Sequence, residues 1–162
     1  MNLHIDPLTD SSPQENLAES GPRQTRRSLP IALLRARESI MAKFRPMLVR
    51  HDINEQQWRV IRVLGEHGEL DASQLAERAL VLGPSLTRMI KTLEKSKLVA
   101  KRSDKSDGRR TIISITAKAK ALIKEVTPES AAIYKEIEQK FGAEQMEQLL
   151  DLLESLTKDG TD

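Results

Sequence analysis

The side chains best suited to chemistry in this sequence are basic and hydroxyl groups gathered between residues 84 and 110. That segment holds nine lysines and arginines against three carboxylates, although the 162-residue chain carries a net charge of only +2. Guanidinium, ammonium and hydroxyl groups donate hydrogen bonds to phosphate oxygens and to the edges of bases. The segment therefore predicts contact with a polyanion such as DNA, and a merely solvated basic face is the alternative.

Two short helices are expected to position these donors. Asp71 followed by Gln74 has the form of a helix N-cap and its reciprocal partner, so one helix should begin just after Asp71. Pro84 suits the first turn of the next helix, where a missing N–H leaves no hydrogen bond unmade. The apolar residues of that second helix recur at three- and four-residue intervals, at Leu86, Met89, Ile90 and Leu93. Its opposite face carries the candidate DNA-contacting residues Ser85, Thr87, Arg88 and Lys91.

A two-stranded ribbon is expected to follow the second helix. Leu98 and Val99 begin one strand, and Ile113 and Ile115 supply the alternating apolar residues of its partner. Asp107-Gly108 is a strong turn dipeptide and favours a hairpin between them. The ribbon is basic, with Lys101, Arg102, Lys105, Arg109 and Arg110. Two helices followed by such a ribbon are the parts of a winged helix-turn-helix, whose second helix enters the major groove of DNA.

Longer amphipathic helices are predicted on both sides of this unit. One covers residues 29–50, with a bend or a break expected near Pro46, and Asn54 with Gln57 should cap the next. After a cap at Thr116, helices are expected over residues 117–158, with a bend at Thr127-Pro128. The apolar residues predicted to face inward in the last helix are Met146, Leu149, Leu150, Leu153 and Leu156. A second copy of the chain would cover these stripes, and a monomeric bundle is the alternative.

These patterns predict a mainly α fold with a small β-hairpin wing, a winged helix-turn-helix flanked by dimerisation helices. The predicted organisation is a flexible N-terminal arm at 1–28, a dimerisation helix at 29–53, a DNA-binding domain at 54–116 and C-terminal dimerisation helices at 117–162. The arm holds three of the seven prolines. Its arginines at 23, 26 and 27 could touch nucleic acid, but an undirected tail is the better interpretation.

Other classes of protein fit the sequence poorly. Cysteine is absent, and the three histidines, His4, His51 and His67, are scattered without a spaced set of carboxylates. No phosphate-cradling glycine loop or activated nucleophile is recognisable, so we expect neither an enzyme nor a bound metal or cofactor. The chain lacks an apolar run of membrane-spanning length and the pattern of a signal peptide, which favours a cytoplasmic protein without a membrane partner.

Two stretches of the sequence resemble a known family. The run DGRRTIISIT, residues 107–116, is similar to the wing signature of the MarR family, with Asp107 and Arg109 at the signature positions and Ile115 where leucine is usual. Residues 83–99 resemble that family's recognition helix and its exit into the wing. Within the family, residues 31–46 and 51–64 look most similar to regulators of homoprotocatechuate degradation operons. The resemblance implies a homodimeric transcriptional regulator, a repressor by expectation, on a pseudo-palindromic double-stranded operator.

The residues expected to contact or to shape the DNA interface come from the second helix and the ribbon: Pro84, Ser85, Thr87, Arg88, Lys91, Lys101, Lys105, Asp107, Arg109 and Arg110. A carboxylate at 107 can hold the guanidinium at 109 by charge-assisted hydrogen bonds and so stiffen the loop. The alternative is an exposed ion pair that contributes little. The competing function is a helical scaffold or partner-binding module that does not recognise DNA.

A small-molecule effector site is expected at the junction of the helical layer and the DNA-binding unit. Arg37 lies at the edge of the apolar stripe of the first helix and can bind a carboxylate through two hydrogen bonds. Trp58 can stack on an aromatic ring, and His51 can donate to a phenol. The sequence therefore predicts a phenolic or aromatic acid as effector, with solvated arginines and a core tryptophan as the alternative interpretation.

Overall fold

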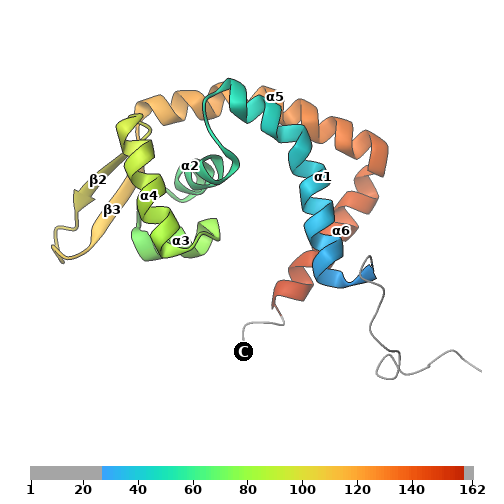
Figure 1. Ribbon diagram of the computed structural model, residues 1–162, viewed down its shortest axis with the longest axis horizontal. Coiled ribbons are helices and arrows are strands. Elements are labelled where there is room, and N and C mark those ends of the chain that lie inside the picture. Colours follow the sequence, from blue (N-terminus) through green and yellow to red (C-terminus); the bar gives the residue numbers. More distant parts are fainter. Residues whose placement is uncertain (1–26, 159–162) are drawn as a thin grey trace, which may run out of the picture. The chain divides into compact units, whose positions relative to one another are not determined.

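The computed structural model describes residues 27–158 and shows a mainly helical chain with a small antiparallel sheet (Figure 1). The predicted class, a helical fold with a β-hairpin wing, is confirmed. The described residues divide into two compact units, 27–38 and 39–158. The predicted arm falls almost wholly outside the described residues. The elements are α1 (Leu29–Arg50), α2 (Glu55–His67), β1 (Leu70–Asp71), α3 (Ala72–Ala79), α4 (Gly83–Lys95), β2 (Val99–Ser103), β3 (Thr111–Ile115), α5 (Ala117–Phe141) and α6 (Ala143–Lys158).

Side-chain caps define the starts of three helices, as the sequence predicted. The Asn54 carboxamide accepts from the Gln57 N–H at 2.9 Å, and the Gln57 side chain accepts from the Asn54 N–H at 3.0 Å. Asp71 and Gln74 make the same reciprocal pair at the start of α3. Thr116 caps α5 by accepting from the Ala119 N–H. Each cap satisfies N–H groups that have no partner within the helix, so these sequence positions fix where the helices begin.

Of the bend or break expected near Pro46, the break is absent, because α1 runs without interruption from Leu29 to Arg50. A proline inside a helix removes one backbone hydrogen bond and crowds the preceding turn. Here its neighbours Phe44, Met47 and Leu48 are buried, and their packing offsets that loss. Helix α5 likewise runs continuously through Pro128. Both prolines thus lie inside continuous helices, and the bends expected at Pro46 and Pro128 stay predictions.

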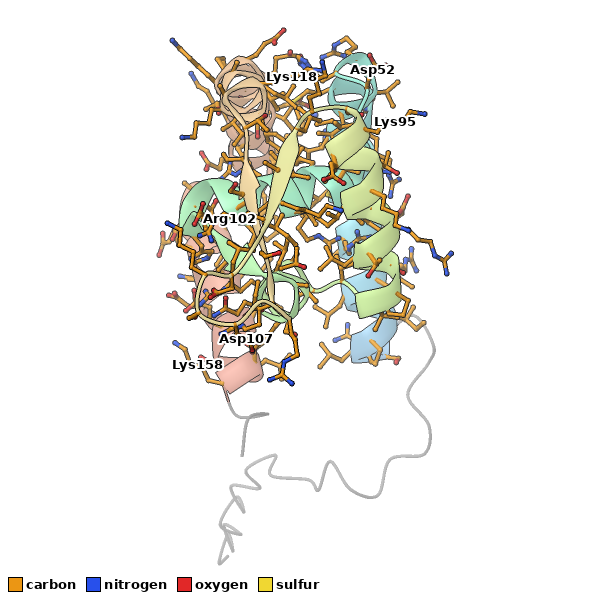
Figure 2. The ribbon with its side chains drawn as sticks, turned by 90° about the vertical axis from the view of Figure 1, so that its left-hand side faces the viewer. Asp52, Lys95, Arg102, Asp107, Lys118 and Lys158 are labelled. Carbon is orange, nitrogen blue, oxygen red and sulfur yellow. The ribbon has the colours of Figure 1, made fainter. Side chains whose placement is uncertain are left out.

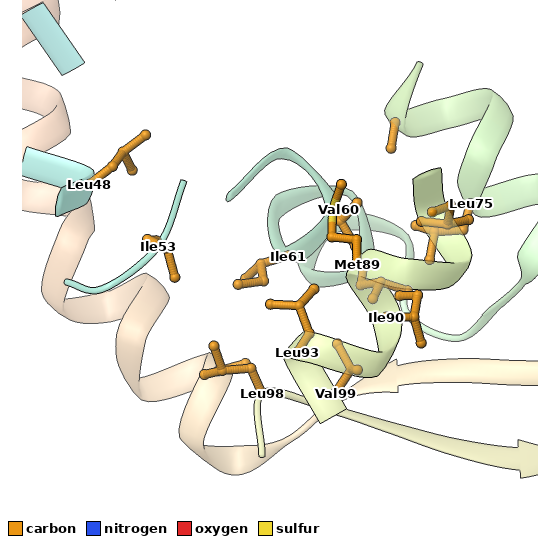
Figure 3. Packing of buried hydrophobic residues seen from close by; sticks show 14 of the residues in the cluster. Leu48, Ile53, Val60, Ile61, Leu75, Met89, Ile90, Leu93, Leu98 and Val99 are labelled. Atoms are coloured by element: carbon orange, nitrogen blue, oxygen red, sulfur yellow. The ribbon is translucent and has the colours of Figure 1, made fainter. Parts of the chain in front are cut away.

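One apolar core joins the helix-turn-helix to its neighbours. Figure 3 shows Val60 and Ile61 of α2 facing Ile90 and Leu93 of α4. All four side chains are buried, and the core extends to Leu48, Ile53, Leu75, Leu98, Val99 and Ile113. The core residues come from α1, α2, α3 and α4 and from the sheet. Because all of these pack together closely, the core fixes the rotation of α4 about its own axis.

The sheet has the strand order β1-β3-β2, and its third strand was not foreseen. The predicted hairpin pairs Val99 with Ile115 and Ser103 with Thr111. The short strand β1 adds to the other edge of β3, with Leu70 opposite Ile113 and Asp71 opposite Ile112. Two residues give too little periodicity to predict a strand from sequence. This strand links the beginning of α3 to the base of the wing.

Three of the leucines predicted to face inward in α6 are exposed within this chain, which corrects the prediction for a single copy. Met146 and Leu153 are half-buried, but Leu149, Leu150 and Leu156 are 37%, 47% and 48% exposed. Within the chain, helix α6 packs mainly on α5, which covers only one of its sides. An apolar face of this size on a surface helix is typical of an interface. None of the described helices is long and apolar enough to cross a membrane.

We expect Leu93→Ala to destabilise the protein by roughly 2–5 kcal/mol, since the substitution leaves a cavity between α4 and α2. Leu93 is 1% exposed, whereas Leu82, at the start of the same helix, is 79% exposed. Leu82→Ala is therefore the matched control and should change the free energy of unfolding by less than about 0.5 kcal/mol. Urea denaturation followed by circular dichroism measures both values. Equal losses in the two variants would contradict the core described above.

Candidate nucleic-acid interface

Helix α4 presents a polar face opposite its buried stripe. Leu86, Met89, Ile90 and Leu93 are buried, as predicted. The predicted DNA-contacting residues of this helix are all exposed, namely Pro84, Ser85, Thr87, Arg88 and Lys91. Leu82 stands at the N-cap and makes no side-chain cap, which leaves the N–H groups of the first turn for an external acceptor. A helix N-terminus with open N–H groups favours a phosphate.

A groove of about 680 Å³ separates α4 from the wing. Leu86, Ile90 and Ile113 contribute its apolar surface. Its polar lining comes from four elements: Ser73 of α3, Thr87, Lys91 and Glu94 of α4, Lys101, Arg102 and Ser103 of β2, and Thr111 of β3. The groove thus brings donors of the helix and of the wing, which are distant in sequence, to one surface.

Asp104 organises the loop at the tip of the wing. Its carboxylate accepts from the Ser106 N–H at 2.7 Å, from the Ser106 hydroxyl at 2.5 Å and from the Asp107 N–H at 3.2 Å. These hydrogen bonds stabilise the charged form and lower the pKa of Asp104 to about 2. The Asp104 N–H also donates to the Arg110 carbonyl, and the Arg110 N–H to the Asp107 carbonyl, each at 2.9 Å. The loop therefore has its own closed set of hydrogen bonds.

The turn predicted at Asp107-Gly108 is present, since the Arg110 N–H donates to the carbonyl of Asp107 three residues earlier, but this turn lies inside a longer loop. A two-residue hairpin turn of that dipeptide needs positive φ at both positions. Among the described residues, Gly68 and Gly142 are the glycines with positive φ, and Gly108 is not. The hairpin forms as predicted, but its strands end at Ser103 and Thr111, and the residues between them follow the acceptor at Asp104.

The predicted contact between Asp107 and Arg109 is present. The Asp107 carboxylate accepts from the Arg109 backbone N–H at 3.1 Å and from its Nε at 3.4 Å. The Arg109 side chain remains 94% exposed, so its guanidinium can still bind another anion. Figure 2 shows Asp107 at the far end of the wing from Lys95 and Lys118. The pair therefore lies at the tip of the ribbon.

Other basic residues of the predicted interface are engaged with carboxylates. Lys101 is 2.8 Å from Glu94, and Arg102 is 2.5 Å from Glu69. Arg110 binds Asp71, whose pKa is lowered by the Gln74 N–H and then by the Arg110 guanidinium. Arg88, Lys91 and Lys105 form no ion pair with other residues in the part of the chain that the structure describes. The basic segment is thus divided into paired and unpaired cations, a division that sequence counting could not show.

The three predicted effector-site residues lie in different surroundings. Arg37 is exposed on α1 in the first unit, and His51 and Trp58 belong to the second. The His51 ring is 2.9 Å from Glu129 of α5, a carboxylate that also binds Arg50. These hydrogen bonds lower the pKa of Glu129, with His51 the larger cause. The predicted His51 donor therefore already has a carboxylate partner.

Arg62 is a candidate that sequence reasoning missed. Its guanidinium carbon lies 5.9 Å from the centre of the Trp58 ring, a cation–π contact, and Glu66 holds it at 2.6 Å. Phe44 and Tyr134 form an aromatic pair elsewhere, with ring centres 5.0 Å apart. The spacing of four residues between Trp58 and Arg62 on one helix face was a usable signal.

The low pKa of Asp104 predicts the behaviour of the wing in acid. A carboxyl whose pKa falls from 3.8 when unfolded to about 2 when folded stabilises the loop above pH 4 and loses that contribution as the pH falls toward 2. We expect the Ser106 and Asp107 amide signals in NMR spectra to titrate with a midpoint near 2. Asp104→Asn keeps an oxygen acceptor and should abolish this titration. A midpoint at the ordinary value would show that Asp104 does not organise the loop.

Comparison with known proteins agrees with this geometry. The MarR family model matches residues 53–111, which run from the start of α2 into the wing. The chain is 43% identical to the homoprotocatechuate degradative operon repressor of Escherichia coli, over 78% of this chain and 86% of that protein. It is 42% identical to the transcriptional regulator FarR of Neisseria gonorrhoeae, over 81% and 90% of the two chains.

A solved structure gives the same answer for the fold. The crystal structure of NadR in complex with 4-hydroxyphenylacetate superposes with a TM-score of 0.75 and 40% identity, covering 82% of this chain and 97% of NadR. The similarity thus extends well beyond the residues of the family model, into the helices on both sides. This protein belongs to the MarR family.

Proposed function

We propose that the protein is a sequence-specific DNA-binding transcriptional repressor, and not an enzyme, that acts in the cytoplasm. The observation that carries this proposal is the division of α4 into a buried apolar stripe and an exposed face bearing Ser85, Thr87, Arg88 and Lys91. A helix held in this way on a compact lobe can lie in the major groove, where each base pair presents a distinct set of donors and acceptors. The names of the relatives, an operon repressor among them, support the same function.

The exposed leucines of α6 support a homodimer. Leu152 is 69% exposed, beside the exposed face already described, and water around these side chains would be released if a second copy covered them. A twofold dimer presents two recognition helices to one side of a duplex. Such an arrangement reads two half-sites related by symmetry and predicts a pseudo-palindromic operator.

The interface divides into base-reading and backbone-contacting groups. We assign Arg88 to a base edge, because it lies on the exposed face near the start of α4, and Arg109 with Lys105 to phosphates or the minor groove, because they lie at the wing. The proposal gives the first turn of α4, where Pro84 lies, a contact with the DNA backbone, since its open N–H groups can donate to a phosphate.

Arg88→Ala and Arg109→Ala are expected to differ in kind. Loss of Arg88 should lower discrimination between operator and random duplex by roughly 1–3 kcal/mol, the difference that one bidentate base contact makes. Loss of Arg109 should weaken binding to both duplexes alike. Fluorescence anisotropy on an operator found by footprinting DNA beside the gene measures both effects. If the two variants lose affinity in the same proportion on every sequence, the role given to Arg88 is wrong; if the parent binds no duplex, the chain is a helical scaffold instead.

The proposed effector is a phenolic or aromatic carboxylic acid. Trp58 is the proposed ring partner, and its cation–π contact adds Arg62 of the same unit as a candidate for the carboxylate. Arg37, in the other unit, stays the carboxylate partner proposed from the sequence. NadR, a relative at 40% identity, was crystallised with 4-hydroxyphenylacetate, which has the ring, the phenol and the carboxylate that such residues would bind. A ligand that prefers a dimer unable to span both half-sites releases DNA in proportion to that preference.

We expect 4-hydroxyphenylacetate to change the fluorescence of the protein and to weaken operator binding. Trp58 is the single tryptophan of the chain, so the signal reports on this position alone. Arg37→Ala should abolish the response while sparing DNA affinity, and Arg62→Ala should weaken ligand binding roughly tenfold or more, as removal of a hydrogen bond to a charged group does. The control ligand is 4-hydroxyphenylethanol, which lacks the carboxylate.

Absence of a fluorescence change at millimolar acid would count against the site. Equal binding of the acid and the alcohol would show that no guanidinium holds the carboxylate. An unchanged response in Arg37→Ala, together with a lost response in Arg62→Ala, would move the carboxylate partner from α1 to α2.

A further inference from the structure

We propose that Asp71 and Glu69 position the wing by holding Arg110 and Arg102, so that two carboxylates near the DNA-binding surface increase DNA affinity. This inference rests on the proposed function. The acidic pair lies on and just before β1, between α2 and α3, and we name the four residues the wing clasp. The clasp assigns Arg110, expected from the sequence to contact DNA, to a positioning role.

The register of the sheet explains why these four side chains meet. Asp71 and Arg102 are both Cα partners of Ile112, one on each side of β3. Side chains alternate along a strand, so Arg110, two residues before Ile112, and Glu69, two residues before Asp71, lie on that same face. The opposite face carries Leu70 and Ile113, which are buried in the core. The clasp therefore forms on the outer side of the sheet.

Arg110 connects this clasp to the loop at the wing tip. Its side chain binds Asp71, its carbonyl accepts from the Asp104 N–H, and its N–H donates to the Asp107 carbonyl. Asp71 in turn accepts from the Gln74 N–H as the cap of α3. One residue pair thus joins the first turn of the helix-turn-helix to both ends of the wing loop.

The direction in which DNA affinity changes when a carboxylate is removed tests the proposal. A carboxylate beside a DNA surface repels phosphates, so its removal should strengthen binding if it has no other role. Freed Arg110 could then neutralise a further phosphate and steepen the salt dependence by about 0.9 in the log–log slope for each subunit. The clasp predicts the opposite change in affinity, because a wing that has lost its anchor no longer holds Lys105 and Arg109 in place.

Asp71→Asn is the decisive variant, because asparagine caps helices as well as aspartate but carries no charge for Arg110. We expect operator affinity to fall roughly threefold to tenfold, the size of coupling usual between contacting residues, with an unchanged salt slope. Arg110→Gln should match it, the double variant should lose no more than either single one, and Arg110→Lys should restore part of the loss. Glu69→Gln, outside the cap, should act in the same direction.

The control is Glu77→Gln, which removes a carboxylate from α3 that has no ion pair within the described residues. It should leave affinity unchanged or raise it slightly. Higher affinity in Asp71→Asn, a steeper slope, or strictly additive losses in the double variant would overturn the clasp. A lower salt slope in Arg110→Gln alone would assign Arg110 to a phosphate instead.

Hydrogen exchange separates the clasp from the proposed function, since it needs no DNA. In Asp71→Asn the amides of residues 104 and 110 should exchange faster, while the Gln74 amide, still capped, stays protected. Faster exchange in Asp71→Asn, with no binding of the parent protein to any duplex, would support the wing clasp and contradict the proposed repressor function. Unchanged exchange at residues 104 and 110 would contradict the wing clasp, whatever the DNA affinity of the variant.

Discussion

The burial of one apolar stripe on α4 is the constraint on which the rest of the interface depends. Leu86, Met89, Ile90 and Leu93 lie against α2, α3 and the sheet, and a helix so held cannot rotate without exposing them. Exposing one such side chain costs about 1.5–3 kcal/mol. The polar face is therefore set by residues that never touch a ligand, and the hydroxyl and guanidinium groups on it need no further support to point outward.

Carboxylates decide which cations of the basic segment can meet an external anion. Asp104 and Asp107 shape the wing loop and leave Lys105 and Arg109 outside, while Glu69, Asp71 and Glu94 occupy Arg102, Arg110 and Lys101. Exposed ion pairs add little stability, so their value here is in geometry. A net charge counted along the sequence overstates the surface available to phosphate. The same five carboxylates hold the basic residues of the wing in a defined arrangement.

Features that depend on neighbours within about four residues were predictable, and those that depend on distant partners were not. The caps at Asn54 and Asp71 and the stripe of α4 follow from local spacing, and all three are present. Arg110 and Asp71 are 39 positions apart, and β1 shows itself only through its pairing with β3. Asp104 was overlooked because Asp107-Gly108 matched a stronger turn rule. The leucines predicted to face inward in α6 are exposed within this chain, because periodicity marks an apolar face without showing whether the same chain or a second copy covers it.

Helix α5 connects the base of the wing, the end of α1 and the start of α6. It is 25 residues long, about 38 Å at the usual rise per residue. Its cap, Thr116, donates a hydrogen bond from its hydroxyl to the Leu98 carbonyl at the base of the wing. Midway, Glu129 holds Arg50 and His51 at the end of α1, and at its far end Gly142 leads into the apolar face of α6. A continuous helix of this length curves only gently, so a displacement at one end is largely passed on to the other. In the proposed repressor, a shift of α6 relative to its dimer partner would therefore move the other end of α5. Helix α4 and the wing, which pack on one core, would then move together.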